Sequence, residues 1–229
     1  DGTAFDWNNP TMKANPYANR DPRLGMTIVY NDMVWPAKAK VEIWEGGENG
    51  LPLNNATTTG YYLRKYVNKD ISFVSGSTST KKHHNWILFR YAEVLLNYAE
   101  AMTNAFGPDY TDAQFPISAR EAVNQVRKRS DVNMPELPAG MSKADFLERL
   151  KNERRVELAF EGHRFWDVRR WKDLNQTANI YGVKVKKTDN GFSYDKFLYE
   201  TRTITDNLYF YPISNTEKYK NPSLGQNPG

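Results

Sequence analysis

The 229-residue sequence contains no cysteine, which excludes disulfide bonds, thiolate metal sites and thiol nucleophiles together. Histidine is also scarce, with three residues in the chain. No stretch approaches the ~18 consecutive apolar residues of a membrane-spanning helix, and no run of like charges forms a basic or acidic arm. The HExxH, GxSxG, P-loop and GxGxxG motifs are absent, so no motif indicates an enzyme class and we predict no catalytic residues.

The chain does have enough apolar material to fold. Hydrophobic residues make up 39% of the sequence and aromatic residues 14%, which is typical of folded proteins rather than disordered ones. The length allows one large domain or two small ones with a real core. The formal net charge of +4 is a mild excess for this length and demands no anionic partner.

A buried helix is predicted over residues 85–104. Apolar side chains follow one stripe at helical spacing and also cover much of the remaining surface, which is typical of a helix buried nearly all round. The stripe consists of Ile87, Tyr91, Val94, Leu95, Tyr98 and Met102. Arg90, Glu93 and Glu100 lie in the same segment and need charged partners, because an unpaired buried ion is costly.

Two further helices are predicted from capping boxes, in which a serine hydroxyl accepts a hydrogen bond from the backbone three residues later. Ser118 opens a helix that runs to about residue 130, and Ser142 opens one that runs to about residue 172. Gly162 lies inside the second, so either the helix breaks there or another backbone passes close by. The short spacing of the three helices favours helical-hairpin packing.

The stretch ERLKNERRVELAFEGHRFWDVRRW (148–171) is rich in ions, so it can form a helix only if those ions pair with each other. At i,i+3 and i,i+4 spacing, Arg154, Glu157, Glu161 and Arg164 are neighbours. Flanking arginines lower the pKa of a carboxyl, whereas a general acid needs a raised pKa. We therefore interpret these carboxylates as structural.

Turn-forming Asn, Gly and Pro residues dominate the start of the chain. Short strands are expected at residues 26–30, 40–44, 61–74, 181–186 and 207–212. We divide the chain into a loop-rich ligand-side region (1–84), a helical framework (85–175) and an irregular C-terminal segment (176–229). The predicted fold class is mainly α with short strands and long loops.

The loops of the first region suit ligand binding better than catalysis. A sugar presents a flat apolar face that stacks on an aromatic ring, and its hydroxyls bond to short polar side chains; loops held by a rigid scaffold are where such residues gather. The predicted ligand-binding residues are Trp7, Tyr17, Asn31, Asp32, Trp35 and Trp44. The alternative for any one loop tryptophan is a plug over the core. Trp86, Trp166 and Trp171 fall in predicted helices and are expected in the core.

Other functions use similar residues. A glycoside hydrolase needs two carboxyls about 5–10 Å apart across a cleft, and Asp6, Asp32, Glu42 and Glu45 are the candidates near the aromatic loops. Proteins that bind single-stranded nucleic acid also use aromatic platforms, but the basic residues here lie mostly among glutamates in predicted helices, so we expect no nucleic-acid partner. A purely structural scaffold is the third alternative.

Three separated motifs carry a family resemblance. NERRVELAFEGHRFWDVRRW (152–171), ILFRYAEVLLNYAEA (87–101) and YPISNTEKYKNPSLGQNPG (211–229) resemble, in the same order, motifs of the SusD/RagB family of nutrient-binding outer-membrane lipoproteins. Weaker resemblance extends to DPRL (21–24) and GYYLRKYVN (60–68), so it covers nearly the whole chain. DPRL and the glutamate-rich helix match family motifs that are architectural.

The resemblance implies the C-terminal portion of a SusD-like protein, packing on an upstream tetratricopeptide-like helical half. It also implies a location on the cell surface at the outer membrane, reached through an N-terminal lipid anchor outside this chain. The implied function is non-catalytic oligosaccharide binding and delivery to a SusC-like TonB-dependent transporter for nutrient uptake; some family members take peptides instead. No cofactor is predicted. Calcium stays open as an alternative, although the sequence has no EF-hand-like loop.

Overall fold

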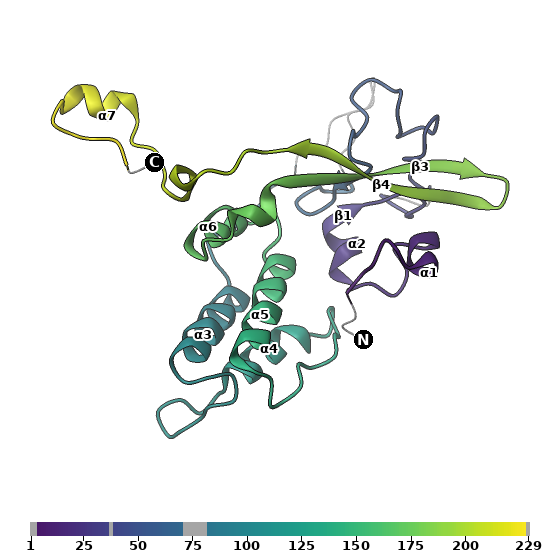
Figure 1. Ribbon diagram of the computed structural model, residues 1–229. Helices are drawn as coiled ribbons and strands as arrows, with labels where there is room; N and C mark the ends of the chain where they lie inside the picture. Colours follow the sequence, from purple (N-terminus) through teal and green to yellow (C-terminus); the bar gives the residue numbers. More distant parts are fainter. Residues whose placement is uncertain (1–3, 37–38, 71–81, 228–229) are drawn as a thin grey trace.

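The computed structural model describes residues 4–36, 39–70 and 82–227 (Figure 1). Its helices, in chain order, are α1 (Pro10–Ala14), α2 (Arg23–Thr27), α3 (Tyr91–Ala105), α4 (Ala119–Arg127), α5 (Lys143–Glu157), α6 (His163–Arg170), η1 (Leu174–Thr177), η2 (Asp206–Tyr209) and α7 (Asn215–Lys220). Its strands are β1 (Ile28–Val29), β2 (Tyr62–Leu63), β3 (Asn179–Thr188) and β4 (Gly191–Thr201). This composition confirms the predicted fold class, mainly α with short strands and long loops.

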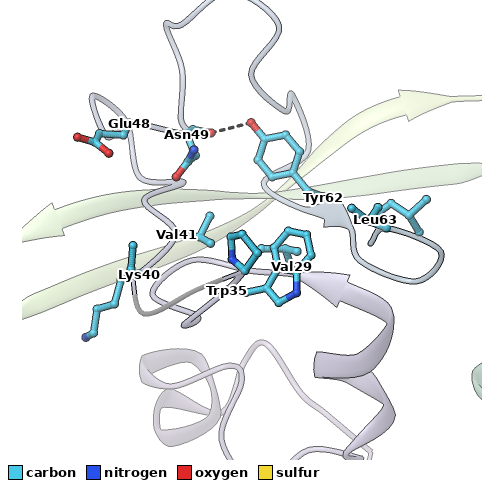
Figure 2. Close-up of a pocket in the computed structure, with 11 residues that line it drawn as sticks. Val29, Trp35, Lys40, Val41, Glu48, Asn49, Tyr62 and Leu63 are labelled. Carbon is cyan, nitrogen blue, oxygen red and sulfur yellow. Dashed lines mark hydrogen bonds between the residues drawn. The ribbon is translucent and has the colours of Figure 1, made fainter. Parts of the chain in front are cut away.

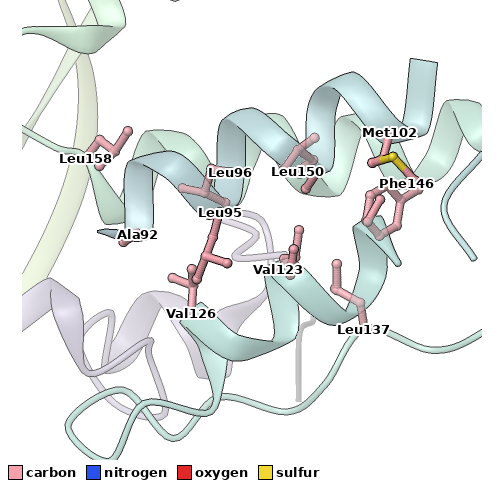
Figure 3. Close-up of a cluster of buried hydrophobic side chains, with 13 residues drawn as sticks. Ala92, Leu95, Leu96, Met102, Val123, Val126, Leu137, Phe146, Leu150 and Leu158 are labelled. Atoms are coloured by element: carbon pink, nitrogen blue, oxygen red, sulfur yellow. The ribbon is translucent and has the colours of Figure 1, made fainter. Parts of the chain in front are cut away.

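Helices α3, α4 and α5 pack together around the main hydrophobic core (Figure 3). The fully buried members include Leu96, Val123 and Phe146. Both serines cap their helices: Ser118 Oγ accepts from the Glu121 amide at 3.1 Å, and Ser142 Oγ accepts from the Asp145 amide at 3.1 Å. The predicted starts of α4 and α5 and the predicted packing of neighbouring helices are confirmed.

The helix predicted from residue 85 begins only at Tyr91. Residues 82–90 form no helix or strand, and Trp86 and Leu88 are 80% and 81% exposed. A short apolar segment becomes helical chiefly when it has a surface to pack against, and none of the described elements covers this one. The expectation that Trp86 lies in the core is therefore wrong for this chain, and so is the one for Trp166, which is 57% exposed on α6.

The helix predicted over 143–172 is two helices. α5 ends at Glu157, and α6 begins at His163. Gly162 between them has φ +84°, a left-handed conformation that glycine adopts without a Cβ penalty. No atom lies within 4 Å of the position a Cβ would take at Gly162. The break, not a close backbone approach, explains this glycine.

The buried ions of α5 find their partners outside the helix, which corrects the predicted pairing along it. Within α5, the exposed Glu148 pairs with Lys151. Arg23 Nη1, from the DPRL segment, lies 2.6 Å from Glu153 and 2.8 Å from Glu157. Arg90 reaches Glu157 and Glu161 from the start of α3. The same glutamates also bind Lys65, Arg127 and Arg129.

This buried ion network joins the loop region to the bundle. Burial alone would raise the pKa of Glu157, but hydrogen bonds from Arg23, Arg90 and Arg129 outweigh it and lower the pKa to about 2. For Glu161 burial is likewise outweighed by Arg90 and Lys65, so its pKa is also lowered. Both carboxyls are charged at neutral pH, as their structural interpretation requires.

The β3–β4 hairpin is longer than the strand predicted at 181–186 and organises the loop region. Loops bond to the outer edge of β3: the Val183 amide donates to the Thr59 carbonyl, and the Glu45 amide donates to the Val185 carbonyl, both at 2.9 Å. The C-terminal segment 176–229 therefore contains regular structure. In Figure 1 the residues around α7 extend away from the rest of the chain.

The other predicted strands are only partly formed. The strand expected at 26–30 is reduced to β1, and the one at 61–74 to β2, with 71–74 outside the described residues. Residues 40–44 contribute a single bridge, between Lys40 and Val34. The strand expected at 207–212 is absent, because η2 occupies its start. Within the described ranges, no helix has the length and apolar character needed to cross a membrane.

Candidate functional site

A pocket of about 480 Å³ opens among the loops of the first region (Figure 2). We call it the Trp35 pocket. It is lined by Val29, Trp35, Pro36, Ala39, Lys40, Val41, Glu48, Asn49, Tyr62, Leu63 and Val67. Aliphatic and aromatic side chains predominate, with polar groups at one side. This volume is within the range of about 300–1,000 Å³ typical of small-molecule sites.

One wall of the pocket comes from strands β1 and β2, which pair antiparallel with Val29 opposite Tyr62. Trp35 stands on the adjoining loop, whose two arms run antiparallel. The Asp32 amide donates to the Val41 carbonyl at 2.8 Å, and the Val41 amide donates to the Met33 carbonyl at 2.9 Å. The Trp35 indole is therefore held near the end of a hydrogen-bonded loop, beside the small sheet.

The opposite side of the pocket is fixed through Asn49. Its side-chain oxygen accepts from the Glu42 amide at 3.0 Å, and its carbonyl accepts from the Tyr62 hydroxyl at 2.7 Å (Figure 2). Gly50 follows, in a place where a Cβ would collide with the Trp44 carbonyl and lie 2.6 Å from the Ile43 carbonyl. Only glycine fits there, so this turn requires glycine at position 50.

The pocket offers an apolar ring and neutral donors. Within the part of the chain that the structure describes, the Trp35 indole N–H and the Asn49 amide Nδ2 donate no hydrogen bond. In Figure 2 the Lys40 side chain points away from Trp35. Such an arrangement can stack a flat apolar face and bond to the hydroxyl or carbonyl oxygens at its edge.

Comparison with known proteins agrees with this architecture. The family model described as the SusD family matches residues 4–229. The chain belongs to the SusD family. The resemblance inferred from the three motifs is thereby confirmed over nearly the whole chain.

Solved structures of SusD-like proteins share the fold. A SusD-like protein from Bacteroides fragilis is 28% identical, with a TM-score of 0.75, over 98% of this chain and 41% of its own. A SusD-like carbohydrate-binding protein from the same organism is 29% identical, with a TM-score of 0.69, over 97% of this chain and 45% of its own.

The curated relatives are longer proteins too. A SusD-like protein from Formosa agariphila is 35% identical over 131 residues, which is 54% of this chain and 23% of the relative. A second from that organism is 30% identical over 48% of this chain and 22% of the relative. The present chain therefore spans less than half the length of the SusD-family proteins it matches.

Of the predicted ligand-binding residues, Trp35 lines the pocket. Trp7, Tyr17 and Trp44 instead pack against a second small core on the β3–β4 hairpin. The Trp44 ring also has the Lys187 ammonium 4.8 Å from its centroid. The structure thus gives these three side chains packing partners, whereas contact with a ligand stays a prediction for each of them.

Asn31 and Asp32 are the two polar residues among the predicted ligand-binding residues. Both support the loop between Asp32 and Val41, which we call the Trp35 loop. Asn31 is buried, and its side-chain oxygen accepts from the amides of Ile43 and Trp44 at 3.0 and 3.1 Å. Asp32 has φ +65° and pairs with Lys40 at 2.8 Å. Both hold the loop that presents Trp35, and direct ligand contact stays a prediction for them as well.

Sequence reasoning missed Tyr62 and Asn49 as pocket residues. Tyr62 lies in GYYLRKYVN (60–68), a segment with only weaker family resemblance, and Asn49 is one of many loop asparagines. Their link across the pocket depends on a hydrogen bond between residues 13 positions apart. No local pattern marks such a pair in advance.

The carboxylates considered for hydrolysis do not meet in this pocket. Asp6, Asp32, Glu42 and Glu45 are outside its lining, to which the described chain contributes one carboxylate, Glu48. Nor do the described residues bring three His, Asp or Glu side chains together in a way that could hold a metal ion.

Proposed function

We propose that this chain carries the ligand-binding pocket of a SusD-family protein that captures oligosaccharides without breaking them. The observation that carries the proposal is the Trp35 pocket, where one indole adjoins aliphatic walls and unused neutral donors. A pyranose ring has an apolar face that gains free energy on an aromatic surface, while its hydroxyls take up the polar groups at the edge.

Each part of the pocket has a role in this proposal. Trp35 provides the stacking platform, Asn49 donates to sugar hydroxyls, and Tyr62 fixes the Asn49 turn. The volume of about 480 Å³ admits a short stretch of an oligosaccharide. We expect modest affinity for one pocket, because sugar hydroxyls exchange water for imperfectly matched protein groups.

The family supports this choice of ligand. One solved relative, 29% identical over nearly the whole of this chain, is described as a SusD-like carbohydrate-binding protein. We further propose that the complete protein is a lipid-anchored, cell-surface component of the outer membrane. It would hand its ligand to a SusC-like TonB-dependent transporter in nutrient uptake. Co-purification of the complete protein with that transporter tests this part separately.

The peptide alternative has less support. A peptide that binds by adding a strand needs a free edge of useful length. Beside the Trp35 pocket, β1 and β2 have two residues each, and the outer edge of β3 already bonds to Thr59 and Glu45. β4 is a longer edge strand, but none of its residues lines this pocket.

Isothermal titration with a panel of tetrasaccharides tests the proposed function. We expect saturable heat with at least one of them for the wild-type chain, and loss of that heat in Trp35→Ala. Trp86→Ala is the matched control, because Trp86 is exposed and lies outside the pocket. Absence of heat with every sugar, or binding that persists in Trp35→Ala, contradicts the proposal. Steady release of reducing ends favours the hydrolase instead.

A further inference from the structure

We infer that the Trp35 pocket selects uncharged oligosaccharides and discriminates against uronate-containing or sulfated ones. This inference rests on the proposed function and adds a substrate class to it. It is carried by where the ionic groups around the pocket lie and by which of them are already paired.

The one cation in the described lining is Lys40, and it is already engaged. Its Nζ lies 2.8 Å from Asp32, across the two arms of the Trp35 loop. Its side chain points away from Trp35 (Figure 2). An anionic sugar on the indole would therefore meet a lysine whose charge is largely balanced by a neighbouring carboxylate.

The one anion in the described lining is Glu48. Its side chain is exposed, and within the described ranges no lysine, arginine or histidine forms a salt bridge with it. Its charge is uncompensated and repels a sugar carboxylate or sulfate. The Lys40–Asp32 pair and Glu48 together carry one net negative charge.

The interior of the pocket gives an anion no compensation. Val29, Val41, Leu63 and Val67 are aliphatic, and the donors available are neutral N–H groups. Moving an anion from water against such a wall costs free energy unless a charged partner receives it. Neutral hydroxyls carry a far smaller penalty and can use the same donors.

Lysines of the β3–β4 hairpin contribute to the positive net charge of the chain but do not line this pocket. Lysines on the β3–β4 hairpin are placed over aromatic rings: Lys184 over Phe197 at 5.3 Å and Lys196 over Tyr181 at 3.8 Å. Neither lysine belongs to the pocket lining. These two lysines are thus no argument for an anionic ligand at Trp35.

Titrations with matched neutral and acidic tetrasaccharides test the inference. Suitable probes are β-1,4-linked glucose and mannose and α-1,4-linked glucose, against β-1,4-mannuronate, α-1,4-galacturonate and a sulfated galactan. We expect the uronates and the sulfated sugar to bind at least about tenfold more weakly than the best neutral sugar. Affinity for the neutral sugar should change less than about twofold between 20 and 200 mM salt.

Two charge variants sharpen the test. Glu48→Gln removes the repelling carboxylate, and Asp32→Asn frees Lys40 while keeping a residue type that tolerates the left-handed backbone at position 32. In each variant the ratio of uronate affinity to neutral-sugar affinity should rise several-fold over that of the wild type, so that any general change in the pocket cancels. Lys38 lies outside the described residues, so Lys38→Gln is included to separate its charge from that of Lys40.

The outcomes distinguish failure of the charge inference from failure of the proposed function. Uronates or sulfated sugars that bind more tightly than every neutral sugar, in a Trp35-dependent way, overturn the charge inference and leave the proposed function intact. Charge variants without effect on uronate binding also overturn it. Failure of all sugars to bind removes the proposed function and the inference with it.

Discussion

Glu157 is the carboxylate through which the stability of the chain can be tested most sharply. It is buried at the end of α5 and accepts hydrogen bonds from Arg23, Arg90 and Arg129. A pKa of about 2 in place of the ordinary 4.5 corresponds to about 3 kcal/mol in favour of the charged form in the folded state. We therefore expect Glu157→Gln, which keeps the shape and removes the charge, to lower the free energy of unfolding by about 3 kcal/mol at pH 7.

The pH dependence of this loss has a definite sign. Because the pKa of Glu157 is lower in the folded chain than in the unfolded one, its contribution is complete above pH 4.5 and disappears as the pH falls toward 2. At pH 3 about 2 kcal/mol of the wild-type advantage should already be gone. Urea unfolding followed by circular dichroism at pH 7, 5, 4 and 3 measures the difference in free energy of unfolding between wild type and Glu157→Gln. We expect this difference to narrow as the pH falls.

Glu148→Gln is the matched control on the same helix. Glu148 is exposed and pairs with Lys151 at the surface, so its loss should cost less than about 0.5 kcal/mol at any of these pH values. The reasoning is refuted if Glu157→Gln and Glu148→Gln unfold alike at pH 7. A difference between wild type and Glu157→Gln that stays constant down to pH 3 refutes it as well.

Two substitutions test the turn and the core. Gly50→Ala should destabilise the chain by about 2 kcal/mol or more in urea unfolding, because a Cβ at this position collides with backbone atoms. Gly225→Ala is the control, since a Cβ there meets open space and should be neutral. Equal effects of the two substitutions would contradict the close approach assigned to Gly50. Leu96→Ala should lower the free energy of unfolding by about 2–5 kcal/mol, because Leu96 is fully buried in the bundle core. Leu88→Ala, at an exposed position, should change it by less than about 0.5 kcal/mol. The reverse order would show that the core is misassigned.

The parts of the fold that could be predicted depend on local chemistry. Ser118 and Ser142 mark helix starts because a cap needs only a hydroxyl and an amide three residues later. The break at Gly162 was one of two local alternatives, and its positive φ decides between them. Neither outcome requires knowledge of a distant segment.

The parts that could not be predicted depend on distant partners. Spacing within α5 suggested that its ions pair along the helix, yet Arg23 reaches Glu153 across 130 positions of sequence. The late start of α3 has the same origin. Residues before Tyr91 have the composition of a buried helix, but burial is decided by what packs against them.

In the candidate site too, local sequence predicts some features, and contacts with distant residues decide the others. Trp35 and Trp44 lie in similar turn-rich sequence, so composition alone ranked them equally. The difference arises because the Glu45 amide bonds to Val185 on β3, which fixes Trp44 against the hairpin core. Trp35 has no such tie to the hairpin among the described contacts, and it lines the pocket beside β1 and β2 instead.

The most direct test of the central claim is a titration followed by indole N–H signals in a ¹H–¹⁵N spectrum. The chain has six tryptophans, and Trp35→Phe assigns the signal of interest. With a neutral tetrasaccharide that gives heat on titration, we expect the Trp35 signal to shift in a saturable way, while the Trp86 signal stays in place. A sugar that binds without moving the Trp35 signal would contradict the account.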